Sequence, residues 1–257
     1  MTAVRVATMQ LGRIRRDCTL QANRQVITGG NTMLGYQAYR ASFNAARIAT
    51  NQTFAPNFRV DLVLPEKPRQ PYDGDRIVAG IFNLFKEQGA QLSPGYLAQK
   101  CFLMAAVAST ALTQARIPHV MTIGDVRHPQ NASPAWGYGV TQESLDADIE
   151  AGDKAGDGKA HAWITLDSGQ VLDITEFSSG VVATQPSAAG RPIIRPSALR
   201  EVTVFSDHTD PSVFEYKPML LGMGYHFSAV TSARTDPMFY PLYRECHSLY
   251  EATFGAP

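Results

Sequence analysis

The segment 160–175, AHAWITLDSGQVLDIT, constrains this 257-residue chain more than any other part of it. Two stretches that alternate between apolar and polar residues flank the turn sequence 167–169, Asp-Ser-Gly. This pattern predicts a β-hairpin with a three-residue loop, in which Gly169 takes the left-handed backbone conformation. The register of this hairpin decides which side chains can act together.

In a three-residue loop His161 pairs with Thr175 and Trp163 pairs with Asp173, so His161 and Asp173 share one face of the hairpin. They then lie diagonally across two strands, about 7 Å apart at the backbone, which an imidazole and a carboxylate can span with a hydrogen bond. A two-residue loop would turn the two side chains to opposite faces. Asp167 is expected at the hairpin tip, exposed to solvent, where its replacement by asparagine would hardly change the activity.

A histidine oriented by a carboxylate is the base half of a nucleophilic triad. Cys101 is the candidate nucleophile, because a thiol beside an imidazolium is ionised near neutral pH and reacts readily with carbonyl carbon. We therefore expect the Cys101 sulfur to face one ring nitrogen of His161 and Asp173 to bind the other.

Cys101 falls on the apolar face of a predicted helix over residues 96–115. Apolar residues recur there at steps of three and four: Leu97, Cys101, Met104, Ala105, Ala108 and Leu112. Pro118 stops this helix, and the alternating residues 119–126 (HVMTIGDV) predict a strand entering a sheet.

Other elements are predicted on both sides of this pair. Helical spacing is found at 36–49 and from Asp75 to Gly89, and the alternation of FRVDLVL (58–64) predicts a strand. Residues 185–195 form a connection with proline and glycine, and 238–254 a closing helix rich in tyrosine.

Residues 127–159 are polar and rich in glycine, and we expect them to form a surface insertion beside the active site with a short acidic helix at 142–151. The acidic residues here are Asp146, Asp148, Asp153 and Asp157. Their spacing does not fit an EF-hand loop, so a solvated loop is favoured over a calcium site and no metal is expected.

Composition limits the classes of partner. Lysine plus arginine and aspartate plus glutamate number 23 each, without a long run of either sign, so neither a nucleic acid nor a membrane surface is an expected partner. No apolar run is long enough to cross a bilayer, and the N-terminus lacks the pattern of a cleaved signal. A cytoplasmic protein is expected, or one exported without a cleavable signal.

Cysteine and glycine patterns exclude further chemistry. Cys18, Cys101 and Cys246 are few, widely spaced and odd in number, which argues against a disulfide framework or a zinc site. Cys18 and Cys246 are interpreted as structural. The glycine-bearing stretches GGNTMLG and GMGYHF lack a phosphate-binding lysine and a third glycine, so no nucleotide or other cofactor is expected.

The segments KCFLMAAVASTALTQARIPHVMTIGDV and AHAWITLDSGQVLDIT together resemble the core of the transglutaminase-like, papain-related superfamily. The resemblance covers about residues 92–175. It implies a catalytic triad of Cys101, His161 and Asp173. It also implies an α+β fold in which the cysteine helix packs on an antiparallel sheet.

The chain departs from the family pattern in three places. Asp173 is followed by Ile-Thr, where many members have a proline nearby. Arg116 replaces the usual glycine before the Ile-Pro turn. The family cysteine commonly lies in the first turn of its helix, whereas here Ser93 and Pro94 could cap an earlier start and leave Cys101 in mid-helix.

Acyl chemistry also needs donors for an oxyanion. The backbone amide of Cys101 is the expected first donor, and Gln91, Tyr96 and Gln99 are open candidates for the second. Trp163 is expected to pack beside the site, with contact to substrate as the alternative.

The fold predicted for residues 1–257 is a single domain with its core at 75–180 and elaborations at 1–74 and 181–257. The predicted function is a cysteine-dependent hydrolase or acyl transferase that acts on a peptide or protein amide through a Cys101 thioester. The oligomeric state is left open. Rival hypotheses are a catalytically inactive transglutaminase-like module that binds a peptide or protein, and a bacterial effector that modifies glutamine side chains.

Overall fold

The computed structural model describes residues 31–87, 97, 100–127, 138–152, 160–175, 204–206 and 215–229. Its elements are α2 (Asn31–Thr53), the 3₁₀ turn η1 (Pro56–Phe58), α3 (Gly74–Glu87), α5 (Cys101–Gln114), β1 (His119–Arg127), α6 (Gln142–Ala151), β2 (His161–Leu166), β3 (Val171–Asp173), β4 (Val204–Ser206), β5 (Glu215–Leu221) and α9 (Gly224–Ala229). The chain is therefore an α+β protein, as predicted. The connection at 185–195 and the tail at 238–254 lie outside the described residues.

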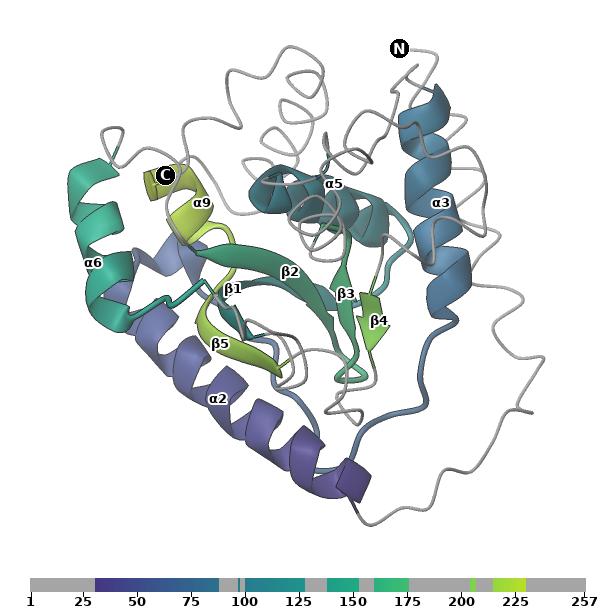
Figure 1. The fold of residues 1–257 in the computed structure, drawn as a ribbon, viewed down its shortest axis with the longest axis horizontal. Coiled ribbons are helices and arrows are strands. Elements are labelled where there is room, and N and C mark those ends of the chain that lie inside the picture. The colour runs from purple at the N-terminus through teal and green to yellow at the C-terminus, as the bar shows by residue number, and fades with distance from the viewer. Residues whose placement is uncertain are drawn as a thin grey trace.

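The strands form an antiparallel sheet in the order β4-β3-β2-β1-β5. Helices cover it from two sides (Figure 1). On one face α2 packs through Tyr39 and Phe43 against Trp163 and Val171. On the other face α5 and α3 enclose apolar residues such as Ile164. Because α2 and β5 belong to this structure, the sheet and its cover extend beyond residues 75–180.

The hairpin between β2 and β3 has the predicted register. Ile164 pairs with Leu172 and Thr165 pairs with Val171, which leaves a three-residue loop at 167–169. Gly169 has a φ of 92°, the left-handed conformation that glycine adopts without strain. The parity that brings His161 and Asp173 to one face is therefore confirmed.

The hairpin tip differs from the prediction, because Asp167 is buried. Its carboxylate pairs with Arg69 and accepts a hydrogen bond of 2.8 Å from the hydroxyl of Tyr72. Gln170 next to the loop also binds the backbone of Tyr72. The proline-rich segment 65–73 thus folds over the tip, a contact that local turn chemistry does not reveal.

The segment 58–64 is not a strand, contrary to the prediction. It runs extended beside α2, where Asn51 binds both backbone groups of Val60 and Arg40 binds the carbonyl of Leu64 at 3.1 Å. Val60 and Leu64 are buried against α2 and the sheet. The alternation of apolar residues therefore arises because one side of this extended segment is buried. Within the described part of the chain, its backbone is hydrogen-bonded to side chains of α2 and not to another strand.

Helix α5 starts later than predicted, because Lys100 has non-helical dihedral angles and Cys101 is the first helical residue. Residues 102–108 are all buried, so the helix lies within the core. Its C-terminus is a Schellman motif: the amide of Ile117 donates to Leu112 and that of Arg116 to Thr113. The prediction that Cys101 lies in mid-helix is wrong.

The other predicted elements of this region are confirmed. Strand β1 covers the expected 119–126, and α6 occupies 142–151. The side chain of Thr141 accepts from the backbone amide of Ser144, and the side chain of Ser144 accepts from the backbone amide of Thr141. The two residues form a capping box at the start of α6. Among the helices that the structure describes, none has the length and apolar character required to cross a membrane.

Arg116 provides a test of the α5 terminus, because its φ of 56° is a strained conformation for a residue with a Cβ atom. We expect Arg116→Gly to raise the free energy of unfolding by about 0.5–1 kcal/mol, the relief of strain less the greater chain entropy of glycine. Arg116→Ala keeps the Cβ and should change little. Urea unfolding of the three proteins measures this, and an equal gain in both variants would contradict the explanation.

Candidate active site

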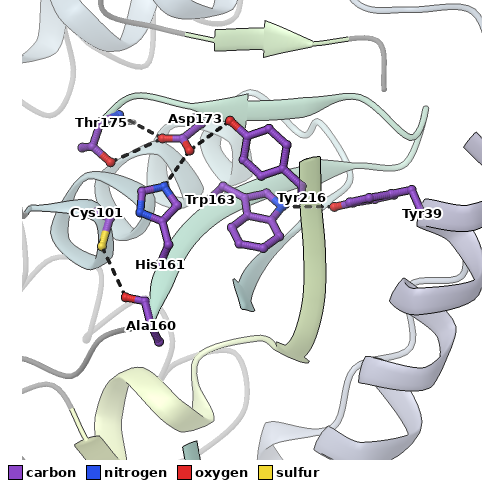
Figure 2. A network of polar contacts seen from close by, with 8 residues as sticks. All are labelled: Tyr39, Cys101, Ala160, His161, Trp163, Asp173, Thr175 and Tyr216. Carbon is purple, nitrogen blue, oxygen red and sulfur yellow. Dashed lines mark hydrogen bonds and ion pairs between the residues drawn. The ribbon is translucent and has the colours of Figure 1, made fainter. Parts of the chain in front are cut away.

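Cys101 and His161 meet at the N-terminal ends of α5 and β2. The Cys101 sulfur lies 3.9 Å from the carbonyl oxygen of Ala160, the residue before the strand. The imidazole of His161 lies beside it, with Nδ1 on the side of the thiol (Figure 2). The thiol is half-buried and free. Cys101 and His161, which lie far apart in the sequence, are thus adjacent in space.

Asp173 binds the other ring nitrogen of His161. Nε2 donates to Oδ2 of Asp173 at 2.6 Å, and both residues are only 1% exposed. The predicted hydrogen bond across the hairpin is confirmed. Nδ1 of His161 is consequently left on the Cys101 side of the ring.

The Asp173 carboxylate is held at both oxygens. Oδ1 accepts from the backbone amide of Thr175 at 2.9 Å and from its hydroxyl at 3.3 Å. Oδ2, which binds His161, also accepts from the hydroxyl of Tyr216 on β5 at 3.1 Å (Figure 2). These donors compensate the loss of water around a buried negative charge.

Aromatic rings surround the imidazole. Tyr138 stacks with His161 at 5.1 Å between ring centroids and an angle of 19°, and Trp163 stacks with it at 6.1 Å and 23°. Trp163 is buried and donates its indole N–H to the hydroxyl of Tyr39 at 3.0 Å. This position fits the packing role expected for Trp163. Tyr138 belongs to the insertion 127–159, so part of that insertion does border the site.

The charge state of His161 follows from its neighbours. Burial by itself lowers the pKa of His161, but the charges of Asp173 and Cys101 and hydrogen bonds to both side chains raise it well above its ordinary value of 6.5. The imidazolium form is therefore favoured at neutral pH. The imidazole thus lies between the carboxylate of Asp173, which favours its charged form, and the side chain of Cys101.

His119 provides a comparison, because its ring nitrogens bind a backbone carbonyl and a hydroxyl instead of a carboxylate. Its Nδ1 binds the carbonyl of Ile117 at 2.7 Å and its Nε2 binds the hydroxyl of Ser109 at 2.9 Å. Burial lowers the pKa of His119, and these two hydrogen bonds do not reverse the effect. The difference between the two histidines supports Asp173 as the residue that keeps His161 charged.

Helix α5 directs its N-terminus at the thiol. Cys101 occupies the first helical position, the side chain of Lys100 provides no cap, and the first intrahelical bond is made by the amide of Met104 to Lys100. The amides of residues 101–103 have no partner within the helix, and they carry the positive end of its dipole. An anion that forms beside Cys101 would be stabilised there.

The predicted second oxyanion donors, Gln91, Tyr96 and Gln99, lie outside the described residues, as do Cys18 and Cys246. Among the residues that the structure describes, no group of three or more metal-binding side chains is found.

Sequence reasoning missed three tyrosines near the site. Tyr216 binds Asp173, and Tyr138 stacks on His161. Tyr225 on α9 stacks on Phe102 at 5.6 Å and donates to Asp148 at 2.6 Å. Burial, the contact with Asp148 and the nearby Cys101 raise the pKa of Tyr225. The sequence signal that could have pointed to Tyr216 is Gly124 on β1, which faces Lys217 on β5, because a glycine within a strand indicates a close backbone approach.

Comparisons with known proteins give no relative for this chain. No family model matches it, and no curated protein or solved structure matches it either.

Replacing Asp173 tests the charge on His161. We expect the ring ¹⁵N resonances of His161 to show imidazolium at pH 7.5 in the wild type and neutral imidazole in Asp173→Asn, because burial then acts without a compensating carboxylate. A raised pKa means that this contribution to stability is complete below pH 6.5 and is lost as the pH rises through the raised value. A neutral His161 in the wild type at pH 7.5 would refute the assignment.

Asp167 provides the contrasting test at the other end of the hairpin. Asp167→Ala should lower the free energy of unfolding by about 1–2 kcal/mol, chiefly because the Tyr72 hydroxyl loses its acceptor. The pair with Arg69 adds little, since Arg69 is 61% exposed. Asp167→Asn keeps an oxygen for Tyr72 and should lose less. Both variants should leave the His161 ¹⁵N resonances unchanged, and a shift in either would place Asp167 in the site.

Proposed function

We propose that this protein is a cysteine-dependent hydrolase or acyl transferase with a transglutaminase-like core, acting on a peptide or protein amide. The observation that carries the proposal is the order Cys101, His161, Asp173 along one line of contacts, with the imidazole between thiol and carboxylate. A thiolate paired with an imidazolium is the resting state that such chemistry requires.

In the proposed reaction the Cys101 sulfur attacks the carbonyl carbon and forms a tetrahedral oxyanion. In this proposal the backbone amide of Cys101, the first residue of α5, donates to that oxygen and stabilises it. His161 gives its proton to the leaving amine as the C–N bond breaks, which leaves a thioester. Water or an amine then attacks the thioester, His161 takes up the proton of the nucleophile, and the C–S bond breaks to regenerate the thiolate. Asp173 keeps the imidazole oriented throughout.

Hydrolysis is favoured over transfer, because it needs no binding site for an acceptor amine. The rival from another class is a catalytically inactive module of the same fold that binds a peptide or protein. The two differ in the behaviour of Cys101. A module has no need of an ionised thiol, whereas an enzyme of this type cannot work without one.

Alkylation by iodoacetamide at pH 6 tests the proposal. We expect Cys101, identified by peptide mapping, to react at least about tenfold faster in the folded wild type than in the same protein unfolded in guanidinium, because only the fold pairs it with His161. His161→Gln should abolish the difference. Equal rates in folded and unfolded protein would refute the enzyme and favour the binding module.

A screen of peptide amides with and without an added primary amine would then separate hydrolysis from transfer. Cys101→Ser is the matched control, since it keeps the shape of the site and removes the thiolate.

A further inference from the structure

We propose that Tyr216 is a positioning residue for the candidate triad, which it serves by fixing the Asp173 carboxylate from the edge strand β5. This inference rests on the proposed function for its kinetic consequences. Its geometric part concerns only the His161–Asp173 pair and can be tested separately.

Tyr216 shares an acceptor with the base. Its hydroxyl donates at 3.1 Å to Oδ2 of Asp173, the same oxygen that accepts from Nε2 of His161 at 2.6 Å. Thr175 holds the other oxygen from two residues along the chain. Rotation of the carboxylate would break the contacts of Oδ2 with His161 and Tyr216 and those of Oδ1 with Thr175. Tyr216 and Thr175 together therefore fix the direction from which Oδ2 meets the imidazole.

The reach of Tyr216 depends on a local feature of β1. β5 and β3 are not neighbours in the sheet, since β1 and β2 lie between them. At Gly124 the register between β1 and β5 shifts by a bulge. A Cβ atom there would meet the carbonyl of Lys217 and approach the indole of Trp163 to 3.1 Å. Because Gly124 has no side chain, the backbone of β5 can approach β1 closely at this point.

The ring of Tyr216 is held as firmly as its hydroxyl. It packs against Trp163 at 5.1 Å and 59°, and it is buried on the sheet face that α2 covers. At the other end of β5, the amide of Leu221 donates to the hydroxyl of Thr50 on α2 at 2.7 Å. The strand that delivers Tyr216 is therefore anchored to the helix opposite the cysteine helix.

Tyr216→Phe tests the inference, because it removes the hydroxyl and keeps the ring. Tyr36→Phe is the matched control: Tyr36 is also buried, and its hydroxyl donates to the carbonyl of Pro65 at 2.7 Å, near the hairpin tip. We expect the Hε2 resonance of His161 to shift or broaden in Tyr216→Phe and to stay unchanged in Tyr36→Phe. Iodoacetamide should alkylate Cys101 about tenfold more slowly at pH 6 in Tyr216→Phe, the equivalent of one hydrogen bond to a charged group.

The outcomes separate this inference from the proposed function. If wild-type Cys101 is no faster than in unfolded protein, the proposed function fails, while the His161 resonance still decides the role of Tyr216. If wild-type Cys101 is fast and Tyr216→Phe matches the wild type in both measurements, Tyr216 has no positioning role. Equal losses in both variants would show general destabilisation and would also overturn the inference.

Should Tyr216→Phe fail to fold, 3-fluorotyrosine at position 216 keeps both the ring and the hydroxyl. Its more acidic hydroxyl donates more strongly to Oδ2. A changed His161 Hε2 resonance then supports the inference, and an unchanged one overturns it.

Discussion

The buried pair of His161 and Asp173 is the interaction on which the rest of this site depends. Both groups are only 1% exposed, and the Asp173 carboxylate holds the pKa of His161 well above its ordinary value despite that burial. The pair requires the three-residue hairpin loop, because a shift of the register by an odd number of residues would place the two side chains on opposite faces of the hairpin. It also requires further donors to Asp173, which Thr175 and Tyr216 supply.

The two helical layers of the fold support this pair in different ways. Helix α5 brings the thiol and the positive end of a helix dipole to the imidazole. On the opposite face Tyr39 of α2 accepts a hydrogen bond from Trp163 (Figure 2). Thr50 of the same helix anchors β5. A site at the junction of both layers can keep a charged base rigid while the thiol remains half-buried.

Local patterns predicted the hairpin well and the helix start poorly, for a physical reason. A turn with Asp-Ser-Gly is specified by three adjacent residues, so the register of His161 and Asp173 could be worked out in advance. Residues 102–108 are buried on every side of α5, so apolar spacing gave no mark of where that helix begins. The alternation of 58–64 reported burial correctly, but it could not say whether a strand or the side chains of α2 would satisfy the backbone.

The sequence by itself determined the α+β class, the hairpin register and the pairing of His161 with Asp173, because each follows from interactions between residues close along the chain. Only the tertiary structure decided that Cys101 begins its helix, that Asp167 is buried beneath residues 65–73, and that Tyr216 binds Asp173. The contacts of Asp167 with Arg69 and of Tyr216 with Asp173 join residues 98 and 43 positions apart. Contacts at that range depend on how the layers pack, and packing leaves no periodic trace in the sequence.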